Sequence, residues 1–167
     1  MKKQTSLFNT YTQQGAAFSD CRKYRYALWR IWDERKPFVM FIGLNPSTAD
    51  ENGNDNTIES VERLSRYNGF GGFYMMNCFA YVSTDPNQLI DVLPGEKETN
   101  FDWLQNTFKR CKDVVFAWGA FSVVAKYQRD TAMTNMFPNA KCITKNKDGS
   151  PGHPLYKKGK TKFIEWK

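Results

Sequence analysis

Long apolar segments are missing from this sequence. The longest uninterrupted apolar runs are residues 38–42 and 114–118, whereas a membrane-spanning helix needs about 20 such residues. Near the N-terminus, Lys2 and Lys3 are followed by polar residues and not by the apolar segment of a secretory signal. We therefore expect a cytoplasmic protein that does not contact a membrane.

Histidine is scarce and the cysteines are scattered. His153 is the only histidine, and no Cys-x-x-Cys pair occurs among Cys21, Cys78, Cys111 and Cys142. This excludes a zinc ribbon and a histidine-based zinc site, because the ligands of such sites come at short, paired spacings. Without an export signal, the thiols are expected to be reduced and mostly packed in the core. The sequence predicts neither a metal nor a cofactor.

Several motifs of nucleotide-binding and hydrolytic enzymes are also missing. There is no Gly-x-x-x-x-Gly-Lys-Ser/Thr, no Gly-x-Gly-x-x-Gly and no Gly-x-Ser-x-Gly. The stretch from Asp50 to Asp55 carries oxygen ligands, but not at the spacing of an EF-hand. These absences argue against a P-loop NTPase, a Rossmann dinucleotide enzyme, an α/β-hydrolase and a calcium loop.

What the sequence does contain is the composition of one globular domain. Of its 167 residues, 41% are hydrophobic, 16% aromatic and 25% charged, which supplies enough large apolar side chains for a single core. No repeat and no linker marks a boundary. We predict one domain over residues 1–167, loosely ordered over residues 1–20 and ending in a basic tail over residues 157–167.

Charge is distributed unevenly along the chain. The net charge of +7 comes from 24 Lys and Arg against 17 Asp and Glu. Residues 22–36 and 141–167 are basic, whereas residues 50–62 are acidic and contain no base. Two basic segments favour a polyanionic partner, either nucleic acid or a nucleotide. The alternative is that the lysine-rich C-terminus is only a solvated tail that keeps the protein soluble.

Apolar strand patterns alternate with amphipathic helix patterns. Residues 38–44, 72–79, 114–118 and 141–144 are typical of buried strands, and helices are expected from about residues 56, 99 and 121. Residues 22–32 alternate like a half-exposed strand, which we expect to pair with residues 38–44 as a hairpin near the sheet edge. The sequence therefore predicts an α/β fold, a three-layer α/β/α sandwich with a mainly parallel central sheet and an antiparallel N-terminal hairpin.

Polar residues follow the predicted parallel strands. In open α/β sheets the ligand crevice lies beyond the carboxyl ends of the strands, which here directs attention to residues 43–50, 77–81, 119 and 150–156. Two of these segments are tight Gly/Pro turns, Gly43–Thr48 and Pro151–Tyr156, and they present Asn45 and His153. Convergence on one sheet edge favours Asn45 and His153 as functional residues over simple turn formers.

These motifs resemble those of the uracil-DNA glycosylase superfamily. Gly43–Ser47 is similar to its first motif, closest to the mismatch-specific uracil/thymine branch, and His153-Pro154 is similar to its second. Met75–Asn77 resembles the strand end whose Asn contacts the base, and Phe116–Gly119 resembles the strand that ends in Trp-Gly. The resemblance implies a uracil-DNA glycosylase-like fold and a nucleobase-directed enzyme that hydrolyses an N-glycosidic bond. Asn45 would position water, His153 would stabilise the departing base, and Asn77 would bind that base.

A closer resemblance, from about Tyr24 to Tyr156, is to domain of unknown function 1643, an uncharacterised family of small bacterial and phage proteins. It rests on Asn45–Asp50, Asn54-Asp55-x-Thr57, Asn77-x-Phe79-Ala80, Asp85-Pro86, Trp118-Gly119 and His153–Tyr156. The acidic residues after the first motif belong to this pattern and could instead bind a metal or a base amine. Leu155-Tyr156 stands where DNA-cleaving glycosylases have a Ser-Pro-x-Ser loop.

The predicted site combines these segments. Besides Asn45 and His153, the residues expected to bind the base or nucleotide are Gly43, Pro46, Ser47, Thr48, Asp50, Asp55, Asn77, Phe79 and Tyr156. The side chains expected to contact phosphate are Lys157, Lys158, Lys160 and Lys162. The aromatic that stacks on the base is one of Phe70, Phe73, Phe79 and Tyr81.

Two alternatives to an enzyme remain open. One is a non-catalytic nucleotide- or DNA-binding module, used for example in phage–host conflict. The other is a structural or inhibitory partner protein that uses the surface of the fold. For the leading hypothesis we expect a monomer whose partner is nucleic acid or a nucleotide.

Overall fold

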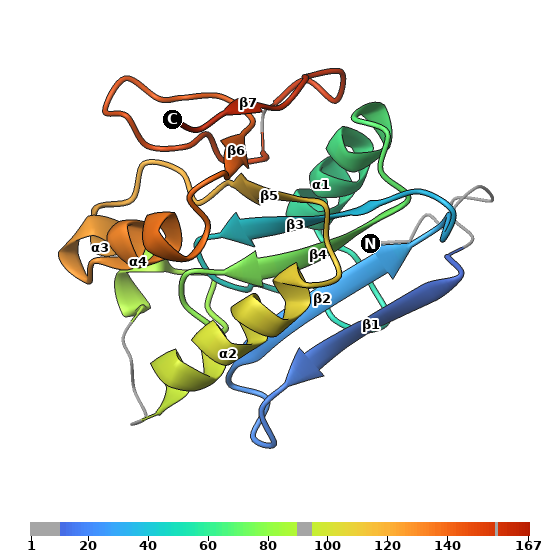
Figure 1. Cartoon of the computed structure of the whole chain (residues 1–167). Helices are drawn as coiled ribbons and strands as arrows, with labels where there is room; N and C mark the ends of the chain where they lie inside the picture. Colours follow the sequence, from blue (N-terminus) through green and yellow to red (C-terminus); the bar gives the residue numbers. More distant parts are fainter. Residues whose placement is uncertain (1–10, 90–94, 156) are drawn as a thin grey trace.

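A seven-stranded sheet forms the centre of the computed structural model, which describes residues 11–89, 95–155 and 157–167 (Figure 1). Its strands, in chain order, are β1 (Gln13–Phe18), β2 (Arg25–Ile31), β3 (Phe38–Gly43), β4 (Gly72–Asn77), β5 (Asp113–Phe116), β6 (Lys141–Cys142) and β7 (Ile164–Glu165). Across the sheet they lie in the order β1-β2-β4-β3-β5-β6-β7. The strands β4, β3, β5 and β6 are mutually parallel, and β1, β2 and β7 are antiparallel to their neighbours.

Helices cover both faces of this sheet. They are α1 (Asn56–Tyr67) on one face, and α2 (Glu96–Phe108), α3 (Ser122–Lys126) and α4 (Arg129–Met136) on the other (Figure 1). Successive residues of β3 alternate between the two cores: Phe41 packs with α1, and Met40 packs with the α2 side. Because both faces are covered, the central strands are continuously apolar, as the sequence predicts. The α/β class and the three-layer architecture are thus confirmed.

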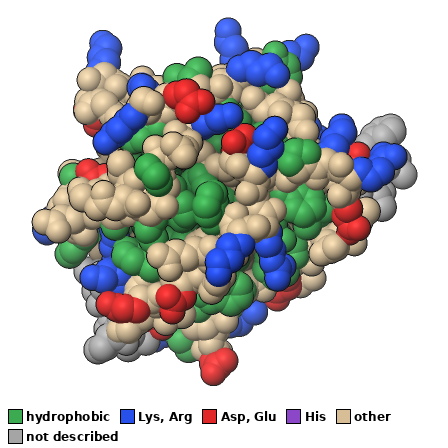
Figure 2. Space-filling model, in the orientation of Figure 1, with side chains coloured by type: hydrophobic (Ala, Val, Ile, Leu, Met, Phe, Trp, Pro, Cys, Tyr) green, Lys and Arg blue, Asp and Glu red, His purple; other side chains and the backbone are tan. Residues whose placement is uncertain are grey.

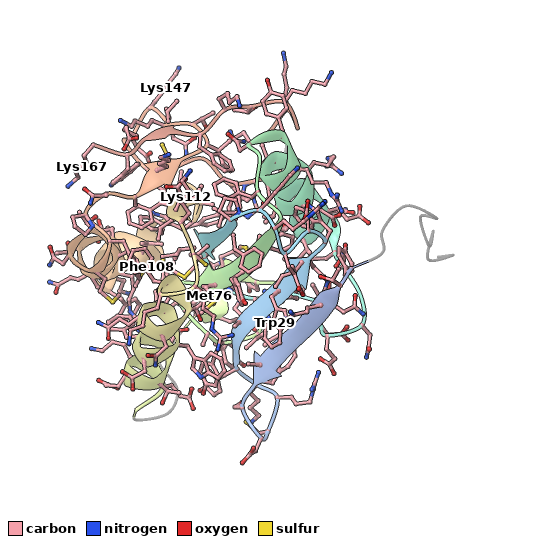
Figure 3. The ribbon with its side chains drawn as sticks, turned by 45° about the vertical axis from the view of Figure 1, so that its right-hand side comes forward. Trp29, Met76, Phe108, Lys112, Lys147 and Lys167 are labelled. Atoms are coloured by element: carbon pink, nitrogen blue, oxygen red, sulfur yellow. The ribbon has the colours of Figure 1, made fainter. Side chains whose placement is uncertain are left out.

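The core is well defined on each side. Leu104 of α2 and Met133 of α4 pack with Met76 of β4, and all three are fully buried. Met76 lies in the interior of the molecule, whereas Lys147 and Lys167 point away from it (Figure 3). Two of the four cysteines, Cys78 and Cys142, are buried, Cys111 is half-buried, Cys21 is exposed, and all four are free thiols.

The N-terminal hairpin differs from the prediction. The hairpin is formed by β1 and β2, and β2 pairs with β4 on its other side, so β2 is an internal strand and does not pair with β3. Residues 11–20 were expected to be loosely ordered, but residues 13–18 form the edge strand. This strand escapes a pattern search because it is polar and includes Gly15, where a Cβ would lie 2.4 Å from the Trp29 ring. Residues 1–10 lie outside the described part of the chain.

The C-terminal segment is packed and is not a free tail. Phe163 stacks against Phe41 and Phe70, at 5.6 and 6.2 Å between ring centroids. Strand β7 pairs with β6, and Trp166 packs against Phe116 and contributes to the core. The prediction of a free tail over 157–167 is therefore wrong in this respect, because Phe163 and Trp166 are half-buried against the core while neighbouring lysines stay exposed. Figure 2 shows Lys and Arg side chains standing along the upper edge of the molecule, over this segment.

One helix of the sequence-based prediction is divided in two. Gln128 adopts φ 56°, and this left-handed residue separates α3 from α4. Within the described residues, none of the helices is long and apolar enough to cross a membrane.

Candidate functional site

A cavity of about 220 Å³ lies at the carboxyl ends of β3 and β4, beside the N-terminus of α1. Its wall contains six of the residues that the sequence predicts for the site: Gly43, Asn45, Ser47, Asp55, Asn77 and His153. The other lining residues are Arg25, Leu44, Thr57, Ile58, Met75, Ser83, Thr84, Pro86, Phe121 and Leu155. Segments far apart in the sequence therefore meet at the sheet edge that the strand order predicts.

Asn77 is the last residue of β4 and places a buried amide at this cavity. The residue is 2% exposed, and neither Nδ2 nor Oδ1 has a hydrogen-bond partner among the described residues. Buried polar groups are almost always paired, since an unpaired one costs about 1–3 kcal/mol. An amide that offers one donor and one acceptor without a protein partner is matched to a ligand that presents an acceptor beside a donor.

The neighbouring glycine makes room for this amide. A Cβ on Gly43 would lie 2.9 Å from Asn77 Oδ1 and 2.5 Å from Met75 Cε. Gly43 thus allows both side chains to cross the end of β3. The Met75 side chain, which also lines the cavity, is unbranched and flexible.

His153 is held as a neutral donor. Its Nδ1 accepts a hydrogen bond of 3.1 Å from the backbone N–H of Leu155, so the proton of the neutral ring is on Nε2. Burial lowers the pKa of His153 below 6.5, nearby Lys157 lowers it further, and Asp55 acts in the opposite direction. At neutral pH the ring therefore carries an Nε2–H that can donate to a ligand.

Phe121 lies next to His153 because of a glycine turn. Gly119 follows β5 with φ +78°, and a Cβ added there would lie 3.1 Å from Phe121 Cε2 and 3.3 Å from His153 Cβ. The Phe121 side chain lines the cavity and remains 39% exposed. Among the lining residues that the structure describes, it is the phenyl ring available for stacking. None of Phe70, Phe73, Phe79 and Tyr81 is among the residues that line the cavity.

Asn45 joins two loops. Its Nδ2 donates to the carbonyl oxygens of Pro46, Tyr81 and Ser83, at 3.1, 3.4 and 2.8 Å. The donor side of the amide is thereby committed to structure, as in an ordinary turn former. Among the described residues, Oδ1 makes no hydrogen bond, so it is free to accept one from a ligand or water.

Asp55 combines a structural and a site role. Its Oδ1 accepts from the backbone N–H of Ile58 at 2.9 Å and so caps α1, a role for which Asp is well suited. The same carboxylate lines the cavity and attracts both Arg25 and His153 electrostatically. It is the acidic side chain of the cavity wall.

The remaining predicted residues lie outside the cavity wall. Pro46 is buried behind it, Thr48 is exposed, and Asp50 Oδ1 accepts from the backbone N–H groups of Asn52 and Gly53 in a turn. Phe79 packs in the opposite core, with its ring edge against Tyr127. Strand alternation ends at Asn77, so the two-residue spacing does not place Phe79 beside it. Tyr156 lies outside the described residues.

The lysines separate into two groups. A Cβ on Gly152 would lie 2.8 Å from Lys157 Cε, so Lys157 lies over the turn that carries His153. The chain then follows α1 away from the cavity. Lys162 Nζ lies 5.1 Å from the Tyr67 ring near the C-terminus of that helix. Lys158, Lys160 and Lys162 are exposed, and only Lys157 of the four adjoins the cavity.

Two other features of the described residues do not form a site. A wider depression of about 650 Å³ lies beside Trp32 and Arg66, near the amino ends of β3 and β4. Its charged residues include both acids and bases, and none of its side-chain atoms is a buried, unpaired donor or acceptor. Within the described residues, no three His, Cys, Asp or Glu side chains gather in a way that could hold a metal ion.

Sequence comparison places the chain in a family. A family model described as protein of unknown function, DUF1643, matches residues 25–155. The chain belongs to this family. The match begins and ends at cavity-lining residues, Arg25 and Leu155, and so spans the whole cavity wall. No curated protein and no solved structure matches the chain.

Sequence reasoning missed Arg25 and Phe121. Phe121 could have been predicted, because it comes two residues after Gly119, a strand end at which the sequence already predicts the ligand crevice. Arg25 carried no such signal, because simple alternation along residues 22–32 puts it on the face of Ala27.

Proposed function

We propose that this protein is a nucleobase-directed enzyme that hydrolyses an N-glycosidic bond in a nucleotide or in nucleic acid. The observation that carries the proposal is the buried amide of Asn77, which has no partner among the described residues and lies in the same cavity wall as His153 and Phe121. A fold of the uracil-DNA glycosylase type is part of the proposal. It is supported by the placement of Asn45 and His153, from two motifs that resemble that superfamily, on one cavity.

The base would be recognised by its edge and its face. Asn77 donates through Nδ2 and accepts through Oδ1, which complements the adjacent acceptor and donor on one edge of a pyrimidine. Phe121 provides a ring for stacking on the base.

The chemistry requires charge stabilisation more than a strong base. As the bond between C1′ and the base nitrogen breaks, its electron pair goes to the base, and positive charge develops on the sugar. The neutral His153 donates from Nε2 to the departing base, an interaction that is worth about 3 kcal/mol in comparable oxyanion sites. Asn45 Oδ1 accepts from the attacking water and orients it. The oxygen of that water bonds to C1′, and the Asp55 carboxylate can take its proton.

A direct assay tests this function. The purified protein is incubated with nucleosides, nucleotides and oligonucleotides that contain each base, and free base is measured by chromatography. We expect release of one base, reduced at least about a hundredfold in His153→Ala, since one such donor contributes about that much. Thr48→Ala, in the same turn as Asn45 but outside the cavity wall, is the control and should keep full activity. Full activity in both His153→Ala and Asn45→Ala would refute the assignment.

One observation favours a second candidate, a binding module without turnover. The Asn45 amide nitrogen is occupied by three backbone carbonyls, so this residue is fully explained as a structural link. The module would bind the base in the same cavity, and Asn45→Ala would lower stability without altering a reaction. Saturable ligand binding with no base release under any condition would support it. Salt-dependent binding to DNA that is lost when Lys157, Lys158, Lys160 and Lys162 are neutralised would point to a backbone-binding form of it.

A further inference from the structure

Arg25 is a buried charge in the cavity wall that the proposed reaction does not use. The residue is 3% exposed. Its Nη1 donates to the carbonyl oxygen of Ala49 at 2.9 Å, and its Nε has no partner among the described residues. Arg25 forms no ion pair within the described part of the chain. Buried arginines are normally paired with an anion, because burial of an unpaired charge is costly.

A bulge in β2 aims this side chain. Ala17 of β1 is opposite Ala27, but the next residue, Phe18, is opposite Arg25, so β2 has one extra residue at this point. Without the extra residue, Arg25 would share the face of Ala27, which packs on the α2 side. The bulge turns it to the α1 side, where the cavity lies. Bulges of this kind are found next to active sites, where they redirect a side chain.

The charges around the cavity leave a place for an anion. Among the described lining residues, Arg25 and Asp55 carry opposite charges and attract each other electrostatically without forming an ion pair. His153 is neutral at pH 7 and Lys157 adjoins its turn, so the net charge beside the cavity is positive. Burial lowers the pKa of Arg25 to about 10, so its guanidinium remains charged. An anionic group at Arg25 would occupy the donor that the protein leaves unpaired. A guanidinium with several N–H donors in one plane suits the oxygens of a phosphate.

We infer that Arg25 binds the terminal phosphate of a mononucleotide, so that the ligand of this cavity is a free nucleotide and not a base within a polymer. The inference rests on the proposed function and narrows its substrate class. The phosphodiesters of a polymer continue on both sides and can reach only the rim of a cavity. Arg25 lines the cavity but is only 3% exposed, so the group that reaches it must be the end of a small ligand. The volume of about 220 Å³ is below the range of about 300–1,000 Å³ typical of larger ligands and admits one small molecule.

Calorimetric titration with three probes tests this inference. The probes are uridine, uridine 5′-monophosphate and a single-stranded oligonucleotide with one internal uridine. We expect the monophosphate to bind at least about tenfold more tightly than the nucleoside, the amount that one charge-assisted hydrogen bond supplies. Arg25→Gln should abolish this difference while the nucleoside affinity stays unchanged. Arg22→Gln is the matched control, because Arg22 is exposed and pairs with Glu51 outside the cavity.

Competition provides a test that needs no variant. In the unmodified protein, inorganic phosphate should weaken binding of the monophosphate and leave binding of the nucleoside unchanged. Equal affinity for nucleoside and monophosphate, or tighter binding of the oligonucleotide than of the monophosphate, would overturn the inference while the base site stands. Absence of binding by all three probes, and by the matching cytidine series, would overturn the proposed function as well.

Discussion

Replacement of Asn77 by leucine should stabilise the ligand-free protein and weaken ligand binding. Both polar atoms of the Asn77 side chain are buried without a partner among the described residues. The cost of leaving such an atom unpaired is about 1–3 kcal/mol. Leucine has a similar size and no polar atoms, so Asn77→Leu removes this cost and retains the packing.

The expected gain is about 1–3 kcal/mol in the free energy of unfolding. For a domain of this size, 1 kcal/mol shifts the midpoint by about 2–4 °C, so the thermal midpoint should rise by about 2–12 °C. Differential scanning calorimetry without ligand measures it directly. Residues kept for function commonly destabilise the fold in this way.

Asn68 offers a control of opposite sign, because both polar atoms of its side chain are paired. Its Nδ2 donates to the carbonyl oxygens of Leu64 and Thr161, each at 2.9 Å, and its Oδ1 accepts from the backbone N–H of Phe163 at 3.0 Å. Asn68→Leu removes these hydrogen bonds and should lower stability by about 1–3 kcal/mol. If Asn77→Leu lowers the midpoint as much as Asn68→Leu does, the Asn77 amide has a partner in the folded protein and the reasoning fails.

Three further outcomes are expected. Gly119→Ala should cost about 1–2 kcal/mol of stability, because φ is +78° at this position. It should also weaken ligand binding, because the added Cβ would approach Phe121 and His153. Unchanged ligand affinity would contradict the placement of these two side chains. Stability should fall below pH 6.5, the ordinary pKa of histidine, because His153 takes up a proton in the unfolded state before it does so in the folded state. Scanning calorimetry as a function of pH should show a smaller fall of the thermal midpoint in His153→Gln than in the unmodified protein. Lys157→Gln should raise the pKa of His153, which an NMR titration of the one histidine measures. An unchanged pKa would show that the lysine lies away from the ring.

The parallel part of the sheet was predictable from sequence. Its strands are covered on both faces, so each is a continuous apolar run such as Val39–Ile42. Asp55 at the start of α1 was predictable as well, because capping is a local interaction within four residues. The sheet edge that carries Asn45, Asn77 and His153 was predictable too, because the ligand crevice of an open α/β sheet lies at the carboxyl ends of its parallel strands.

Pairing and bulges were not predictable in this way. The polar strand β1 is stabilised by its position against β2 and has no apolar pattern of its own. The bulge at Arg25 reverses the side to which this residue points, which alternation cannot anticipate. The C-terminal lysines look like a solvated tail in sequence, because the contacts that anchor Phe163 and Trp166 join them to residues more than forty positions away.

The central claim is that the cavity at the end of β4 binds a nucleobase through Asn77. Calorimetric titration of pyrimidine nucleosides into the unmodified protein and into Asn77→Leu tests it most directly. The account predicts saturable binding that is insensitive to salt and at least about tenfold weaker in the variant, since two hydrogen bonds are lost. Equal affinity in the two proteins, or no saturable binding in either, would contradict it.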